Sequence, residues 1–180
     1  FKFRKKLVIL TEHWSGFPLK QLTKTNKLIA KIAINHCKVI CPVSLFLMKS
    51  MQKSGISGNF KVIPNPIDMK IFYYKKKQQN CVVKILFVGR QIPERNTPII
   101  LKAIKEISKE FTNFHLDIVG GGSHLEQYEK LCNKLELKKF VTFHGQVVRS
   151  NIIDYIHSAD FVLIPAGTET QSVFLNEAMA

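Results

Sequence analysis

The feature that most constrains the fold is a regular alternation of apolar, strand-like runs and helical stretches over residues 82–180, with short connections between them. Such alternation predicts a parallel β-sheet with helices on both faces. The strand-like runs are continuously apolar, which is typical of strands buried on both sides. Strands are predicted at 84–88, 115–119, 140–143 and 161–164, and helices at 98–111, 123–135, 149–158 and 172–180.

The first 63 residues show the same kind of pattern in shorter form. Ser44 is a candidate N-cap and Gly55 a candidate terminator of one helix. Pro64-Asn65-Pro66 then ends the last strand, because proline cannot donate to a sheet. Strands are predicted at 6–11, 39–42 and 61–63, and helices from about 18 to 36 and from 45 to 54.

These patterns predict an α/β protein with two domains. Residues 1–63 form part of the first, the aperiodic residues 64–81 are a linker, and residues 82–180 form the second. The chain begins with Phe1 and stops at Ala180 inside a predicted helix, so we expect an internal fragment of a longer protein.

Charge and composition narrow the function. The chain has 27 Lys and Arg against 13 Asp and Glu, a formal charge of +14 that favours anionic partners. No basic stripe interleaved with aromatic residues supports nucleic-acid binding, and no apolar run approaches the roughly 20 residues of a membrane span. Four cysteines without a second ligand pair predict no metal site and fit a reducing, cytoplasmic compartment: Cys37, Cys41, Cys81 and Cys132.

The loops after the predicted strands carry the functional signal, because ligands of parallel sheets bind beyond the carboxyl ends of the strands. Gly89-Arg90 follows one strand and Arg95 precedes a helix, so two guanidinium groups and free helix N–H groups can clamp a diphosphate. Two surface arginines on a loop remain the alternative. Gly120-Gly121-Gly122 lets backbone approach a ligand or makes a plain tight turn. Leu125 replaces the third glycine of a dinucleotide fingerprint, which disfavours a dehydrogenase.

Two glutamates near the C-terminus, Glu169 and Glu177, are separated by seven residues. We expect them to face one crevice, where carboxylates can accept hydrogen bonds from sugar hydroxyls. His144 is interpreted as a structural histidine.

Taken in order, these motifs resemble those of the group 1 (family 4) glycosyltransferases of the GT-B fold, over nearly all 180 residues. The motifs are Thr11–Gly16, Cys41–Ser44, Asn65-Pro66-Ile67-Asp68, Phe87-Val88-Gly89-Arg90, Ile118–Gly122, Phe143–Val147, Ala159–Pro165 and Glu169 with Glu177-Ala178-Met179-Ala180. The resemblance implies two Rossmann-like lobes, the first represented by its C-terminal part and the second lacking its last elements.

The resemblance also implies a function: retaining, metal-independent transfer of a sugar from a nucleoside-diphosphate sugar to a saccharide or lipid-linked saccharide, with no cofactor. No Asp-x-Asp pair occurs, which disfavours a metal-dependent GT-A transferase. A retaining glycoside hydrolase, with two carboxylates about 5 Å apart, fits a phosphate-binding edge less well. We expect residues 1–180 alone not to support transfer.

Residue roles follow from the same resemblance. Arg90 and Arg95 would serve the diphosphate, Arg95-Asn96 standing where Lys-Gly is usual. Glu177 would hold the ribose, Glu169 the donor sugar, and His13 would reach that sugar from the first domain. The remaining donor-binding candidates are Gly89, Gly121, Gly145, Gln146, Val147, Thr170, Gln171 and Ser172. Glu169-Thr170-Gln171-Ser172 replaces the usual Glu-Gly-Phe-Gly or Glu-Thr-Phe-Gly, so we expect retained binding with altered fit.

Three alternatives stay open: a GT-B-like sugar-nucleotide epimerase, a glycogen phosphorylase relative, and a nucleotide-binding module without activity. Basic residues at Lys2–Lys6 and Lys20–Lys31 suggest peripheral contact with an anionic membrane at its cytoplasmic face.

Overall fold

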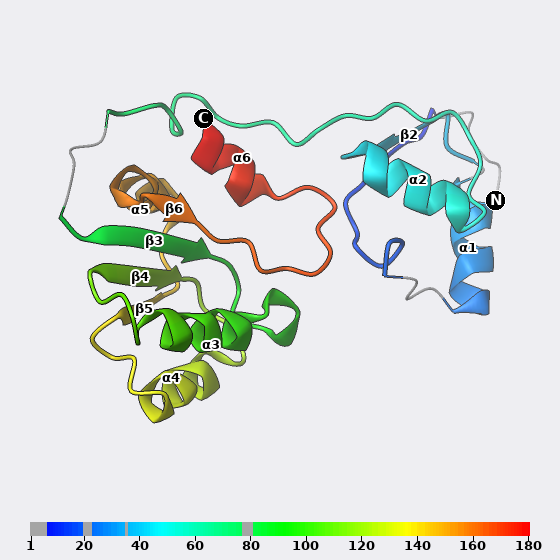
Figure 1. Cartoon of the computed structure of the whole chain (residues 1–180). Helices are drawn as coiled ribbons and strands as arrows, with labels where there is room; N and C mark the ends of the chain where they lie inside the picture. The colour runs from blue at the N-terminus through cyan, green and yellow to red at the C-terminus, as the bar shows by residue number, and fades with distance from the viewer. Residues whose placement is uncertain (1–6, 20–22, 35, 77–80) are drawn as a thin grey trace. The chain divides into compact units, whose positions relative to one another are not determined.

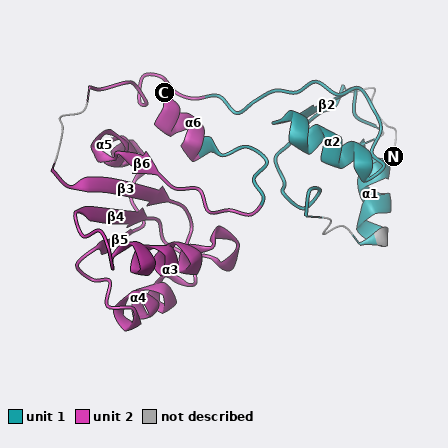
Figure 2. Ribbon diagram, viewed as in Figure 1, with its two compact units in different colours: residues 1–66, 168–173 teal, residues 67–167, 174–180 magenta. Residues whose placement is uncertain are grey.

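A computed structural model describes residues 7–19, 23–34, 36–76 and 81–180 of the chain. The chain divides into two compact units, shown in Figure 2. The first comprises residues 1–66 with 168–173, and the second comprises 67–167 with 174–180. Both contain parallel strands and helices, so the predicted α/β class is confirmed.

The first unit is built on two parallel strands, β1 (Ile9–Glu12) and β2 (Val39–Pro42), with helix α1 (Lys24–Ile34) between them in the chain (Figure 1). The segment 61–63, predicted as a strand, runs beside β2 without forming one. Ile63 N–H donates to the Pro42 carbonyl at 3.0 Å, but the pairing is reduced to an isolated bridge between Phe60 and Ile40. The prolines that follow cannot extend it.

Helix α2 (Leu45–Lys53) has the predicted ends. The Ser44 hydroxyl accepts a hydrogen bond from Leu47 N–H at 3.1 Å, and Gly55 adopts a φ of +82° just beyond the helix. Both features satisfy backbone groups that a helix leaves unpaired. Leu47 and Met51 are completely buried, and they anchor α2 in the core of this unit.

The second unit contains a four-stranded, fully parallel sheet in the order β5-β4-β3-β6. Chain order reverses between β3 and β6, and open α/β sheets bind ligands at such a switch point. The strands are β3 (Val83–Val88), β4 (Phe114–Val119), β5 (Val141–Gly145) and β6 (Phe161–Val162).

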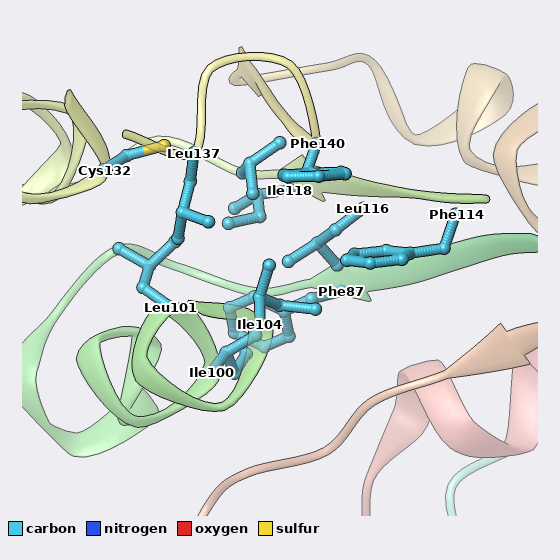
Figure 3. Packing of buried hydrophobic residues seen from close by; sticks show 11 residues of the cluster. Phe87, Ile100, Leu101, Ile104, Phe114, Leu116, Ile118, Cys132, Leu137 and Phe140 are labelled. Atoms are coloured by element: carbon cyan, nitrogen blue, oxygen red, sulfur yellow. The ribbon is translucent and has the colours of Figure 1, made fainter. Parts of the chain in front are cut away.

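Helices cover this sheet. Leu116 and Ile118 on one face of β4 pack against Leu101 and Ile104 of α3, as Figure 3 shows. Each such side chain contributes about 1.5–3 kcal/mol when fully buried. Helix α3 ends earlier than predicted, at Ile107. The helices are α3 (Thr97–Ile107), α4 (Leu125–Lys134), α5 (Ile152–Ser158) and α6 (Val173–Met179), with 3-10 turns at Pro93–Arg95 and Arg149–Asn151.

Candidate functional site

A cavity of about 390 Å³ opens at the carboxyl ends of β3, β4 and β5 in the second unit. Strand ends and the loops that follow them form its walls. The predicted donor-binding residues that line it are Gly89, Arg90, Gly121, Gln146 and Val147. The structure therefore brings together, in one hollow, residues from three loops that are well separated in the sequence.

Arg90 and Arg95 approach this region in different ways. Arg90 is exposed and lines the cavity directly. Arg95 ends the 3-10 turn before α3, and its Cδ lies 3.9 Å from where a Cβ on Gly89 would stand. The aliphatic stem of Arg95 thus packs beside the loop that carries Arg90, while its side chain is not part of the cavity wall.

Asn96 occupies the position where the resemblance leads us to expect glycine. Its φ of +54° lies in the left-handed region, which asparagine adopts more readily than most residues. Its side-chain Nδ2 donates to the Pro165 carbonyl at 2.9 Å. Asn96 therefore keeps the backbone geometry that a glycine would allow, and it also ties the loops on either side of the switch point together.

The three consecutive glycines have separate roles. A Cβ on Gly120, whose φ is +132°, would lie 2.1 Å from the Gly89 carbonyl oxygen, and one on Gly122 would lie 2.4 Å from the Gln91 carbonyl oxygen. These two glycines are needed because the loops after β3 and β4 contact each other there, so close approach of a ligand is not the reason for them. A Cβ on Gly121 would meet its nearest atom, Cβ of Gln146, at 3.4 Å, so of the three only Gly121 fits the expected ligand-facing role.

Strand β5 ends at Gly145, which has a φ of +63° and open space where a Cβ would stand. Its carbonyl accepts a hydrogen bond from Gly120 N–H at 2.7 Å. His144 Nε2 lies 2.6 Å from Asp117 Oδ1, and its ring packs edge-on against Tyr155 of α5. These contacts account for His144 as a structural residue.

Glu177 is the most deeply buried acidic residue in the described part of the chain, with 6% of its side chain exposed. Its carboxylate accepts a hydrogen bond from Arg149 Nη2. Arg149 is a residue that the sequence reasoning missed, because its one signal is a positive charge in the loop after a strand. Glu177 lies about one turn into α6, which begins at Val173, one residue later than predicted.

The first unit holds the other predicted catalytic candidates. The Thr170 hydroxyl donates to the His13 carbonyl at 3.0 Å, and the Glu12 carboxylate accepts the His13 backbone N–H at 2.9 Å. The exposed His13 is thus fixed through its backbone from both sides. The segment that carries the half-buried Glu169 is held beside it.

Gln171, which departs from the family pattern, has a definite partner in the same unit. Its Oε1 accepts the backbone N–H of Asn65 at 2.7 Å. Asn65 lies between Pro64 and Pro66, which have no N–H, so its N–H is the backbone donor of this three-residue segment. The neighbouring Ser172 is half-buried. Because Glu169 and Glu177 belong to different units, their common crevice stays a prediction.

The described part of the chain contains no group of three or more His, Cys, Asp or Glu side chains arranged to hold a metal. No helix within residues 7–19, 23–34, 36–76 and 81–180 is long and apolar enough to cross a bilayer. The basic stretch Lys2–Lys6 and residues 20–22 lie outside the described residues.

Comparison with known proteins identifies relatives over most of the chain. The family described as "Glycosyl transferases group 1" matches residues 73–180. The alpha-monoglucosyldiacylglycerol synthase of Acholeplasma laidlawii is 27% identical over 136 residues, covering 68% of this chain and 34% of that protein.

Solved structures show the same fold. A TarM variant from S. aureus, in complex with fondaparinux, alpha-GlcNAc-glycerol and UDP, matches 99% of this chain with a TM-score of 0.82 at 14% identity. HepE from Anabaena, in complex with UDP and glucose, matches 97% with a TM-score of 0.81 at 16% identity. The chain spans 36% and 51% of these two proteins, so it corresponds to about a third to a half of such molecules.

Proposed function

Because the chain belongs to the group 1 glycosyl transferases, we propose that the whole protein transfers a sugar from a nucleoside-diphosphate sugar to a saccharide or lipid-linked acceptor. The observation that carries this proposal is the cavity at the carboxyl ends of β3, β4 and β5, which combines Arg90 with backbone-rich loops. A nucleotide needs both features: a cation for its phosphates and exposed backbone groups for its polar edges.

The chemistry suits this site. When the glycosyl–phosphate bond breaks, negative charge develops on the leaving diphosphate and positive charge on the sugar ring. Arg90 stabilises the diphosphate, with Arg95 adding to the local positive charge from the adjacent turn. A preorganised donor of this kind contributes about 3–4 kcal/mol to transition-state stabilisation. Guanidinium groups then do the work of a metal ion, and the proposed reaction needs neither metal nor cofactor.

The carboxylates have separate proposed roles. Glu177, held by Arg149, accepts hydrogen bonds from the ribose hydroxyls. Glu169 and His13, which lie in the first unit, contact the donor sugar, and the reaction proceeds with retention of anomeric configuration. The nucleotide base contacts backbone groups of Gly145, Gln146 and Val147. The loop beside the sugar is formed by Thr170, Gln171 and Ser172.

Three of the similar proteins indicate the substrate classes. The solved structures of TarM and HepE contain UDP, which favours a UDP-sugar donor. The name of the Acholeplasma laidlawii relative, a monoglucosyldiacylglycerol synthase, favours an acceptor carried by a lipid. With such an acceptor, the proposed site of action is the cytoplasmic face of an anionic membrane, in peripheral contact that the formal charge of +14 favours. Nucleic acid is not a proposed partner.

A donor screen tests the proposal. The whole protein is incubated with UDP-, GDP- and ADP-sugars and lipid or saccharide acceptors, with and without EDTA, and the glycosylated product is identified by mass spectrometry and its anomeric configuration by NMR. Transfer that persists in EDTA and retains configuration supports every part of the proposal. Donor hydrolysis without transfer, epimerised donor, or binding alone would contradict it.

A further inference from the structure

A completely buried polar side chain lies next to Arg90. Gln91 exposes none of its surface, and both ends of its amide are paired. Its Nε2 donates to the Gly89 carbonyl at 2.8 Å, and its Oε1 accepts from the Thr97 hydroxyl at 2.8 Å. Thr97 is equally buried and is the first residue of α3. The amide therefore bridges the loop after β3 to the helix that follows it.

The backbone of Gln91 is fixed as firmly as its side chain. Its N–H donates to the Gly121 carbonyl at 2.9 Å, and its own carbonyl accepts from His124 N–H at 3.0 Å. Gly89 N–H donates to the Val119 carbonyl at 2.9 Å, so the pairing of β3 with β4 continues through the loop. The backbone of Gln91 is thus bonded to the loop between β4 and α4, and its side chain to its own loop and to α3.

The fixed backbone of Gln91 limits where Arg90 can lie. The chain turns at this point, because Ile92 N–H donates to the Arg90 carbonyl at 3.0 Å. Gln91 projects into the interior, whereas Arg90 is exposed and lines the cavity. A rotation of the loop that moved Arg90 would withdraw the Gln91 amide from Thr97 of α3 and leave buried polar groups unpaired, which is costly.

An apolar pair at positions 91 and 97 would fill the same space without restricting the orientation of the loop. Packing by shape alone is seen in α3 at Ile100, Leu101 and Ile104. A satisfied buried polar network instead favours one geometry, because each hydrogen bond depends on direction as well as distance.

We propose that Gln91, fixed by the Thr97 hydroxyl, is a positioning residue that holds Arg90 in place for the donor diphosphate. This inference rests on the proposed function and adds to it a pair of residues that touch no substrate. A positioning role differs from a purely structural one in one respect. Loss of the Gln91–Thr97 hydrogen bond should weaken nucleotide binding only when Arg90 is present.

The test is calorimetry. The unaltered whole protein is first titrated with UDP, GDP and ADP in turn, and the nucleoside diphosphate that binds is then used to titrate each variant. Thr97→Val removes the hydroxyl at constant shape, and Thr97→Ser retains it. Each is made alone and together with Arg90→Ala, and thermal unfolding is recorded for every variant. We expect Thr97→Val to weaken binding about tenfold in the presence of Arg90 and not at all in its absence. Thr97→Ser restores affinity close to that of the unaltered protein.

The outcomes separate the two proposals. If the unaltered protein binds none of the three diphosphates, the proposed function fails and this inference fails with it. If it binds and Arg90→Ala weakens binding, but Thr97→Val has no effect or the same effect without Arg90, only the positioning role is overturned. Should Thr97→Val not fold, Gln91→Met, which removes both hydrogen bonds at similar volume, gives the same comparison with the same expected and contradicting results.

Discussion

The guanidinium of Arg149 donates to the carboxylate of Glu177, and the two ends of this ion pair differ greatly in exposure. The Glu177 side chain is 6% exposed and that of Arg149 is 64% exposed. The guanidinium also lies 5.9 Å from the ring centre of the buried Phe72. The pair therefore connects the loop after β5 with α6, and it gives a buried carboxylate a partner that reaches in from the surface.

Removing Arg149 should destabilise the second unit. In Arg149→Ala the buried Glu177 carboxylate loses its cationic partner, so we expect the free energy of unfolding to fall by about 1–3 kcal/mol. Denaturant unfolding measures this change. The control is Lys130→Ala, which breaks an exposed pair with Glu126 within α4 and should cost less than about 0.5 kcal/mol. Equal losses in the two variants would contradict this account of Glu177.

The glycine triplet offers a second test. In Gly120→Ala or Gly122→Ala the added methyl group meets backbone of the neighbouring loop, so we expect a loss of about 2–4 kcal/mol in each. Gly121→Ala has room for its methyl group and should unfold at nearly the temperature of the unaltered protein, while weakening nucleotide binding. Comparable destabilisation by all three changes, recorded in thermal melts, would show that the loops pack differently.

Much of the fold follows from the sequence. The apolar runs around Leu86 and Ile118 predict two central strands, and Ser44 predicts the start of α2, because these signals are local. The strand predicted at 61–63 was wrong, since its pairing with β2 is limited to an isolated bridge and the two prolines that follow cannot extend it.

The site was predictable only in part, for a physical reason. Arg90 and Gly121 stand out because residue type and position after a strand are visible in the sequence. The Gln91–Thr97 bridge and the Arg149 partner of Glu177 are not, because they depend on contacts between loops that form only after the sheet has assembled.

The thiol of Cys132 provides a test of packing in the second unit. Burial raises its pKa, opposed in part by Lys138. The folded protein therefore keeps the thiol proton to a higher pH than the unfolded chain does. Its contribution to stability is fully present below the unfolded pKa and is lost as the pH rises through the folded pKa.

The measurement is alkylation by iodoacetamide at pH 8, followed by mass spectrometry. We expect the exposed Cys81 to react first and Cys132 to react only when urea unfolds the protein, because the thiolate is the reactive form. Modification of Cys132 as fast as Cys81 in the folded protein would be inconsistent with the core described for α4.

The two glutamates should affect different steps. Glu177→Gln keeps the shape of the side chain but removes its charge, so we expect UDP binding to weaken by about tenfold or more. Glu169→Gln should leave UDP binding unchanged and slow transfer, because its proposed partner is the sugar. Calorimetry and a transfer assay on the whole protein separate these effects, and the reverse pattern would exchange the two roles.

The most direct test of the donor site is the affinity of the whole protein for UDP before and after Arg90→Ala. The control is Lys102→Ala, which removes the same charge from the exposed side of α3, away from the cavity. Loss of a charge-assisted hydrogen bond weakens binding by about tenfold to a hundredfold, so we expect that loss for Arg90→Ala and almost none for Lys102→Ala. Equal affinity in all three proteins would contradict a diphosphate site at the carboxyl end of β3.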